Sequence, residues 1–291
     1  MTFRERLQEN KFTVTCEITP PKGAEAGERL ADAETLKGRV DALAVTDGKG
    51  SVMAMTPLVM AHLLQKRGFE ALLHVSCRDR NRLSLQADLL GAAALGIGNL
   101  VVATGDYASM GDHPQTKPVF DLDSVQLLRG IQRLESGQDL GGNPLSGRPA
   151  FFAGATVSPN PGREAALELQ LIRMEQKIGA GAKFFLTQPV FDLAAFGRFM
   201  KRAVSFRVPI LASVLPLKSA SMARFINKNL PGVFVPEPLI EEIGGAADRV
   251  KAAFVLCARL VQELRGLCQG VHFLPAGWER KVPAILEAVK L

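Results

Sequence analysis

Eight short apolar runs, separated by segments with helical patterning over 291 residues, predict a (β/α)8 barrel (TIM barrel). Each run is almost continuously apolar, as expected for a parallel strand that is buried on both faces. Each run also ends in Gly, Pro, Asp, Thr or Ser, which commonly terminate strands. Eight strand–helix units of about 36 residues fill the chain, and such a barrel typically needs about 250 residues. We therefore expect residues 1–291 to form a single catalytic domain.

The expected elements follow one another in strict alternation. The strands are expected at 12–18, 42–46, 71–77, 99–105, 151–157, 183–188, 209–215 and 271–276. Helices, with apolar residues at spacings of three and four, are expected at 56–67, 83–95, 124–134, 164–180 and 246–267. The polar, glycine-rich segment 136–149 is expected to be a surface loop. An open doubly wound sheet is the alternative, but no G-x-G-x-x-G motif follows any of the strands.

Composition excludes several classes of protein. The chain is 47% hydrophobic and 22% charged, which favours a folded core over disorder. We expect neither a membrane span nor a secretory signal, and hence a cytoplasmic protein, because no apolar stretch approaches 18 residues. The net charge of +6 is spread along the chain, and one Trp and one Tyr are too few to stack nucleic-acid bases. Four scattered cysteines predict free thiols, with no iron–sulfur cluster in this chain.

Glu17 is the most unusual residue at the strand ends, where a barrel of this kind carries its active site. It lies in an apolar strand between Cys16 and Ile18, where a charge is costly unless it is paired or protonated. A desolvated glutamate is expected to have a raised pKa and to act as a general acid near neutral pH. The alternative is a structural glutamate paired with an interior Lys or Arg.

Other strand ends supply further candidates. Asp106 follows Gly105 at the end of the fourth strand and could be either a functional carboxylate or a helix N-cap. The glycines of the segment TDGKGS, 46–51, indicate either a close backbone approach to a ligand or an ordinary loop. No metal site is expected, because the histidines lack ligand spacing. Of these, His62 and His272 are expected to be packing or surface residues.

Six segments, in chain order, are similar to motifs of the methylenetetrahydrofolate reductase family. They are CEITPPKG after the first strand, VSCRDRN after the third, ATGD after the fourth, GDHPQTKPVFDLDSVQLL (111–128), FFLTQPVFD after the sixth, and GVHFLPAGW (270–278). The resemblance covers nearly the whole chain and is to the short bacterial catalytic form. The CRDRN and TQPVFD segments are similar to the branch found in acetogens and other anaerobes.

The resemblance implies a flavoprotein with noncovalent FAD that reduces 5,10-methylenetetrahydrofolate to 5-methyltetrahydrofolate by hydride transfer from the reduced flavin. The family's general-acid glutamate falls on Glu17, its aspartate on Asp106 and its folate-binding glutamine on Gln188. The family's folate-contacting phenylalanine falls near Phe225. The residues implied for FAD are Thr46, His74, Arg78, Ala103, Thr104, Gly105, Asp106, Phe120, Asp121, Ala155 and Lys177. Lys177 and the pair of Arg78 and Arg80 are expected at the pyrophosphate.

The resemblance leaves the electron donor open between NADH, NADPH and a donor protein subunit, which would have to carry any iron–sulfur centre. The segment 214–225, with Leu215, Leu217, Met222 and Phe225, could form part of an apolar docking surface or pack into the core. A homo-oligomer or a hetero-complex is compatible with the sequence. The functional alternatives are a flavin-free pterin-binding methyltransferase module and a non-catalytic barrel subunit of an electron-transfer complex.

Overall fold

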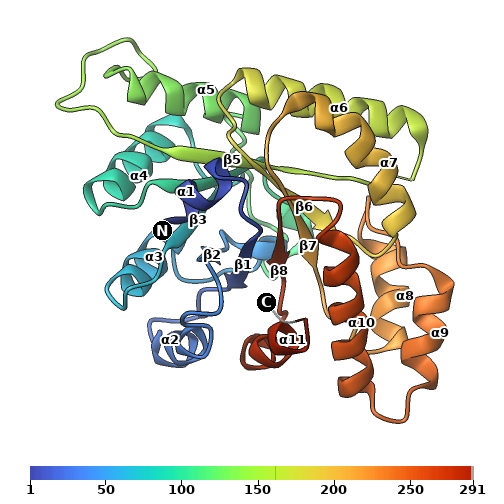
Figure 1. The fold of residues 1–291 in the computed structure, drawn as a ribbon. Coiled ribbons are helices and arrows are strands. Elements are labelled where there is room, and N and C mark those ends of the chain that lie inside the picture. Colours follow the sequence, from blue (N-terminus) through green and yellow to red (C-terminus); the bar gives the residue numbers. More distant parts are fainter. Residues whose placement is uncertain (161, 290–291) are drawn as a thin grey trace.

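Eight parallel strands close into a barrel in the computed structural model, which describes residues 1–160 and 162–289 (Figure 1). The helices lie around the outside of the strands. The first strand, β1, pairs with both β2 and β8, so the sheet closes on itself. This closure rules out the open doubly wound sheet and confirms the predicted (β/α)8 barrel.

The bounds of the elements follow the predicted alternation. The strands are β1 Thr13–Ile18, β2 Ala42–Val45, β3 Ala71–Ser76, β4 Asn99–Ala103, β5 Phe152–Val157, β6 Phe185–Pro189, β7 Ile210–Val214 and β8 Gly270–Phe273. The helices are α1 Phe3–Gln8, α2 Gly27–Glu34, α3 Pro57–Gln65, α4 Arg82–Ala94, α5 Ser124–Glu135, α6 Glu164–Gly179, α7 Leu193–Ala203, α8 Ala220–Asn229, α9 Glu237–Gly245, α10 Arg249–Leu264 and α11 Val282–Ala288. Single turns of 3-10 helix are η1 Lys49–Ser51, η2 Ala108–Met110, η3 Val204–Phe206 and η4 Glu279–Lys281.

The four helices expected between residues 56 and 180 are present as α3 to α6, and the segment 136–149 is a loop as predicted. The helix expected at 246–267 is wrong at its start, because α10 begins only at Arg249. Asp248 caps α10 by accepting hydrogen bonds from the N–H groups of Val250 and Lys251, both at 3.0 Å. Such a cap marks the start of a helix independently of the apolar pattern.

The barrel interior holds an apolar cluster of its own, separate from the apolar layer between strands and helices. Its apolar side chains are those of Ala42, Ala44, Leu72, Val101, Phe152, Phe184, Leu186 and Leu211. Phe3 and Leu7 of α1 join this cluster, so that α1 closes the end of the barrel where the strands begin. The Phe184 ring lies at its centre, with centroid distances of 5.2 Å to Phe3 and 5.3 Å to Phe152. The outer layer packs between the strands and the helices.

All four cysteines are buried free thiols, as predicted. Among the described residues, none of the helices combines the length and the apolar character that crossing a bilayer requires.

Candidate active site

A layer of polar side chains lies above the apolar interior, at the C-terminal ends of the strands. Glu17 of β1 and His272 of β8 are almost fully buried, and Glu17 Oε1 lies 3.8 Å from His272 Nε2. On the other side of the same imidazole, Nδ1 lies 2.8 Å from Thr15 Oγ1. His74 of β3 contributes a second ring, whose centroid is 6.4 Å from that of His272. Glu17 therefore lies beside two imidazoles at the mouth of the barrel, of which that of His272 is buried and that of His74 is half-buried.

Glu17 forms an ion pair with Lys49, a residue of η1 in the loop after β2. The ammonium of Lys49 donates to Glu17 Oε2. Burial alone would raise the pKa of Glu17, but the charge of Lys49 and the imidazole of His272 hold it at about 2. The expectation of a raised pKa is therefore wrong. The alternative, a glutamate paired with a cation, is observed in part, because this cation comes from the rim of the barrel and not from its interior.

Asp106 joins two loops at the mouth. Its Oδ2 accepts a hydrogen bond from the Gly50 N–H at 3.1 Å, and its carbonyl accepts one from Ser51 Oγ at 3.3 Å. The helix-cap alternative for Asp106 is wrong, because the next α-helix, α5, is capped by Asp123. The carboxylate of Asp106 thus supports the loop that carries Lys49.

Four buried polar atoms at the mouth lack a hydrogen-bond partner among the described residues: Thr46 Oγ1, His74 Nε2, Ser76 Oγ and His272 Nε2. Burial lowers the pKa of His74 to about 4, so its ring is neutral at neutral pH. A buried polar group without a partner costs about 1–3 kcal/mol, so native proteins rarely leave one without a reason. The positions of these four atoms, directly after β2 and on β3 and β8, all toward the C-terminal ends of the strands, fit a site that binds a polar ligand.

Gly105 allows the loop after β4 to approach the loop after β3 closely. Its φ of +101° is unfavourable for other residues, and an added Cβ would lie 2.9 Å from Arg78 Cβ and 3.4 Å from Ser76 Cβ. The carbonyls of Ala103 and Thr104 both lie 3.2 Å from the Cys77 nitrogen. The hydroxyl of Thr104 donates to Ser124 Oγ at 3.2 Å. Backbone groups therefore line the mouth between β3 and β4.

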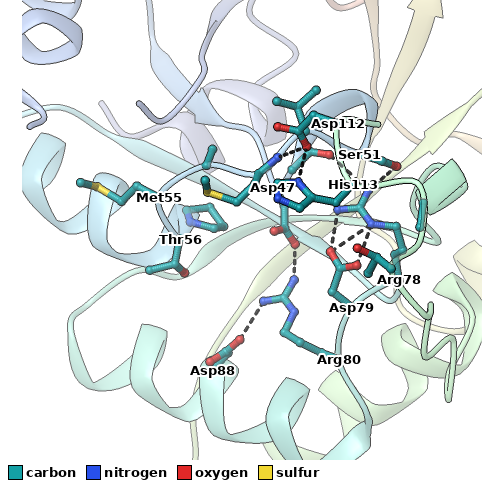
Figure 2. A pocket seen from close by; sticks show the side chains of 17 residues that line it. Asp47, Ser51, Met55, Thr56, Arg78, Asp79, Arg80, Asp88, Asp112 and His113 are labelled. Carbon is teal, nitrogen blue, oxygen red and sulfur yellow. Dashed lines mark hydrogen bonds and ion pairs between the residues drawn. The ribbon is translucent and has the colours of Figure 1, made fainter. Parts of the chain in front are cut away.

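A pocket of about 430 Å³ adjoins this layer, between the loops that follow β2, β3 and β4 (Figure 2). Figure 2 shows the guanidinium of Arg80 between the carboxylates of Asp47 and Asp88. Arg80 lies 2.7 Å from Asp88. The side chain of Arg78 is 5% exposed, and its guanidinium lies 2.6 Å from Asp79. Both arginines are thus neutralised by carboxylates, and a phosphate would have to replace these partners.

Three predicted flavin residues lie farther along the same side of the barrel. Asp121 forms a two-oxygen ion pair with Arg82, which holds the pKa of Asp121 at about 2. Phe120 packs edge-on against Tyr107, with ring centroids 6.4 Å apart. The ammonium of Lys177 donates to the Thr156 carbonyl at 2.7 Å, and burial lowers the pKa of Lys177 to about 8.

Ala155, Gln188 and Phe225 differ in their placement. Gln188 is the second-last residue of β6 and has an exposed side chain, at a register shift between Leu186 and Pro189. Ala155 is fully buried in the outer core layer, so its side chain faces the helices. Phe225 is 61% exposed on α8, and its described contacts involve no other predicted site residue. Of these three, only Gln188 combines an exposed side chain with a position near the C-terminal end of a strand.

The segment 214–225 is divided between the core and the surface. Leu215 and Leu217 are buried in a cluster with side chains of α8, α9 and α10, whereas Met222 is half-buried. Of the two alternatives for Leu215 and Leu217, packing into the core is the one observed, because both are covered by the helices that follow β7.

Lys49 was missed in the sequence analysis. The segment TDGKGS was singled out for its glycines, although its lysine supplies the partner of Glu17. His272, expected to be a packing or surface residue, is buried, and its ring also lies 3.8 Å from the carboxylate of Glu17. Both residues meet Glu17 only because β1 pairs with β2 on one side and with β8 on the other.

The fold and the mouth together define a (β/α)8 barrel with a buried carboxylate and unpaired hydrogen-bonding groups at the C-terminal ends of its strands. The family model described as methylenetetrahydrofolate reductase matches residues 2–290, and the chain belongs to this family.

Similarity to individual relatives is moderate. The chain is 26% identical to 5,10-methylenetetrahydrofolate reductase of Pectobacterium carotovorum subsp. carotovorum, over 72% of this chain and 66% of that protein. It is 22% identical to the Escherichia coli K12 protein of the same name, over 88% of this chain and 81% of that protein. Methylenetetrahydrofolate reductase 2 of Schizosaccharomyces pombe is 24% identical, over 93% of this chain and 44% of that protein. The chain thus spans less than half of this longer relative.

Solved structures share the fold. A Clostridium thermocellum protein described as binding two copies of 5-methyl-5,6,7,8-tetrahydrofolic acid has a TM-score of 0.64 and 16% identity, over 100% of this chain and 98% of that one. A 2,3-dimethylmalate lyase has a TM-score of 0.57 and 13% identity, over 99% of this chain and 83% of that one. At these identities the likeness is one of fold.

Proposed function

We propose that this protein reduces 5,10-methylenetetrahydrofolate to 5-methyltetrahydrofolate, with Glu17 as the proton donor and FAD as the cofactor. The observation that carries the proposal is the placement of Glu17 at the mouth of the barrel, beside buried polar groups that lack partners. Family membership and the names of the bacterial relatives support the reaction. The Clostridium thermocellum protein of the same fold supports a folate ligand.

The chemistry assigns a task to each residue at the mouth. Bound FAD supplies the hydride. Opening the imidazolidine ring of the folate requires a proton on the departing nitrogen, and Glu17 is placed to donate it. The ring opening leaves an iminium cation, which the carboxylate of Asp106 stabilises electrostatically. The amide of Gln188 can donate and accept hydrogen bonds at once and so suits the edge of a pterin.

The residues of this chain fit a flavin. Thr46 and His74 offer buried polar atoms without partners in the described structure, and the backbone around Gly105 can approach a flat ring closely. Arg78 and Lys177 would hold the pyrophosphate once Arg78 exchanges Asp79 for phosphate oxygens.

The proposed function is tested first on the purified protein. A flavoprotein is yellow, whereas the flavin-free pterin-binding module that we considered as an alternative would be colourless. The protein is then photoreduced without oxygen and mixed with methylenetetrahydrofolate. We expect the flavin absorbance to return as the folate is reduced. A bound flavin that stays reduced in the presence of excess folate would contradict the proposed reaction.

We predict that Asp106→Asn lowers folate turnover and raises the flavin reduction potential. The asparagine side-chain oxygen can still accept from the Gly50 N–H, so the loop contact survives while the negative charge is lost. Loss of a nearby negative charge makes the reduced, anionic flavin easier to form. Anaerobic titration against a reference dye measures the potential. As a control, Asp139→Asn removes one negative charge from the loop before β5 and should leave the flavin potential unchanged. An unaltered potential in Asp106→Asn would argue against the placement of Asp106 beside the flavin.

The electron donor stays a prediction. We expect the isolated chain to oxidise NADH slowly and to accept electrons much faster from its native partner, in line with the resemblance to the anaerobe branch. Stopped-flow reduction of the flavin by NADH measures this rate. Turnover of about 10 per second with NADH alone, an ordinary enzyme rate, would show that no partner is needed.

A further inference from the structure

The loop around Lys49 is held at three points, two on its backbone and one on the Ser51 hydroxyl. Arg78 donates to the Gly48 carbonyl at 3.2 Å and to Ser51 Oγ at 3.0 Å, and Asp106 accepts from the Gly50 N–H at 3.1 Å. Gly48, Gly50 and Ser51 all have left-handed φ values, between 55° and 64°. The base of the Lys49 side chain is therefore fixed, although its side chain is 44% exposed.

The Lys49 ammonium covers the atom of Glu17 that a folate must reach. Glu17 Oε1 points toward His272 inside the barrel, and Oε2 accepts from Lys49 at the rim. The departing nitrogen of the folate enters from the mouth, so it competes with Lys49 for Oε2. A long lysine side chain has about 2 kcal/mol of rotamer entropy and can swing away from a fixed backbone.

The ion pair also opposes the chemistry proposed for Glu17. A carboxylate whose pKa is held at about 2 is deprotonated at neutral pH and has no proton to donate. When an ammonium leaves a buried carboxylate, the cost of desolvation is no longer offset and the pKa rises. The other groups that face Glu17 are His272 and His74, and burial keeps His74 neutral at neutral pH.

We propose that Lys49 is a positioning residue that keeps Glu17 as a carboxylate until methylenetetrahydrofolate enters, and that displacement of its ammonium by the folate lets Glu17 take up the proton it then donates. This inference rests on the proposed function. One proton passes from solvent to a Glu17 oxygen and then to the folate nitrogen, whose bond to carbon breaks with its electron pair. Lys49 keeps its own proton throughout and moves into solvent.

Proton uptake on binding tests the inference without turnover. Methylenetetrahydrofolate is titrated calorimetrically onto the enzyme with oxidised flavin, which cannot supply hydride, in two buffers of different ionisation enthalpy near pH 7.5. We expect the wild type to take up close to one proton per site. Lys49→Met should take up much less, because its Glu17 is already protonated, whereas Lys49→Arg should resemble the wild type. Uptake in Lys49→Met equal to that of the wild type, or none in the wild type, would overturn the inference.

A pH profile supplies the second measurement. In Lys49→Met, the inflection of flavin reoxidation that reports ionisation of Glu17 should move upward by several pH units, because burial without a compensating charge raises the pKa of a carboxylate well above its usual range. A merely structural lysine would lower the rate without moving the inflection. Glu17→Gln separates the two proposals: normal folate reduction in that variant would reject the role of Glu17, whereas an unmoved inflection in Lys49→Met would reject only the role of Lys49.

Discussion

Glu17→Gln is expected to abolish the reoxidation of reduced flavin by methylenetetrahydrofolate, with a loss of at least about 100-fold in the single-turnover rate. The amide has nearly the size of the carboxyl group and can still accept from Lys49, so the mouth should keep its shape. It cannot donate an acidic proton to the departing nitrogen. Anaerobic stopped-flow absorbance of the photoreduced variant measures the effect.

Two controls accompany the Glu17→Gln variant. Its flavin content and its photoreduction should match those of the wild type, which separates loss of chemistry from loss of cofactor. Glu279→Gln is a matched substitution, since Glu279 of η4 is also 7% exposed and accepts from the Gly277 N–H, a bond that glutamine can keep. We expect Glu279→Gln to reoxidise at the wild-type rate. Reoxidation of Glu17→Gln at that same rate would reject Glu17 as the acid.

The barrel was predictable because a parallel strand that is buried on both faces has a nearly continuous apolar sequence. The run at 99–105 and the observed β4, Asn99–Ala103, differ only at the end where the strand gives way to Thr104 and Gly105. Glu17 was identified from the same pattern, because a charged residue is unexpected within an apolar run. Local patterns of this kind need no knowledge of distant residues.

The electrostatics of the site were not predictable in the same way. The pKa of Glu17 depends on Lys49, 32 residues away in the chain, and on His272, which reaches Glu17 only when β8 closes on β1. Burial could be anticipated from the apolar run, but the compensating charge could not. Burial raises the pKa of Glu17 and the nearby positive charge lowers it, so the balance of the two determines the direction of the pKa shift. Only the burial could be inferred from the sequence.

Ala155 shows a different limit. A family motif places it on the fifth strand, but side chains alternate between the two faces, and a shift of one residue exchanges the interior for the outer layer. Phe152 belongs to the inner cluster, which puts Gly154 and Thr156 on the inward face and Ala155 on the outward one. The register of the strand therefore determines which of two adjacent residues points into the barrel and can contact a ligand.

Gly154→Ala is expected to destabilise the barrel by about 1–3 kcal/mol, because it adds a methyl group to an interior that is already full. A Cβ at this position would lie 2.6 Å or less from three atoms of the Phe184 ring. That ring is confined by the stacked ring of Phe152 and the edge-on ring of Phe3. Either the ring or strand β5 must therefore move, and thermal and urea unfolding monitored by circular dichroism would measure the cost.

Gly197→Ala supplies the matched control for Gly154→Ala, because it adds the same methyl group within α7, where an added Cβ meets no atom within 4 Å. A helix-interior glycine is about 0.5–1 kcal/mol less favourable than alanine, so this variant should be slightly more stable than the wild type. Opposite signs for the two substitutions would locate the cost in the ring packing of the interior. A Gly154→Ala variant as stable as the wild type would instead mean that Phe184 has room to turn, and that α1 does not close this end of the barrel tightly.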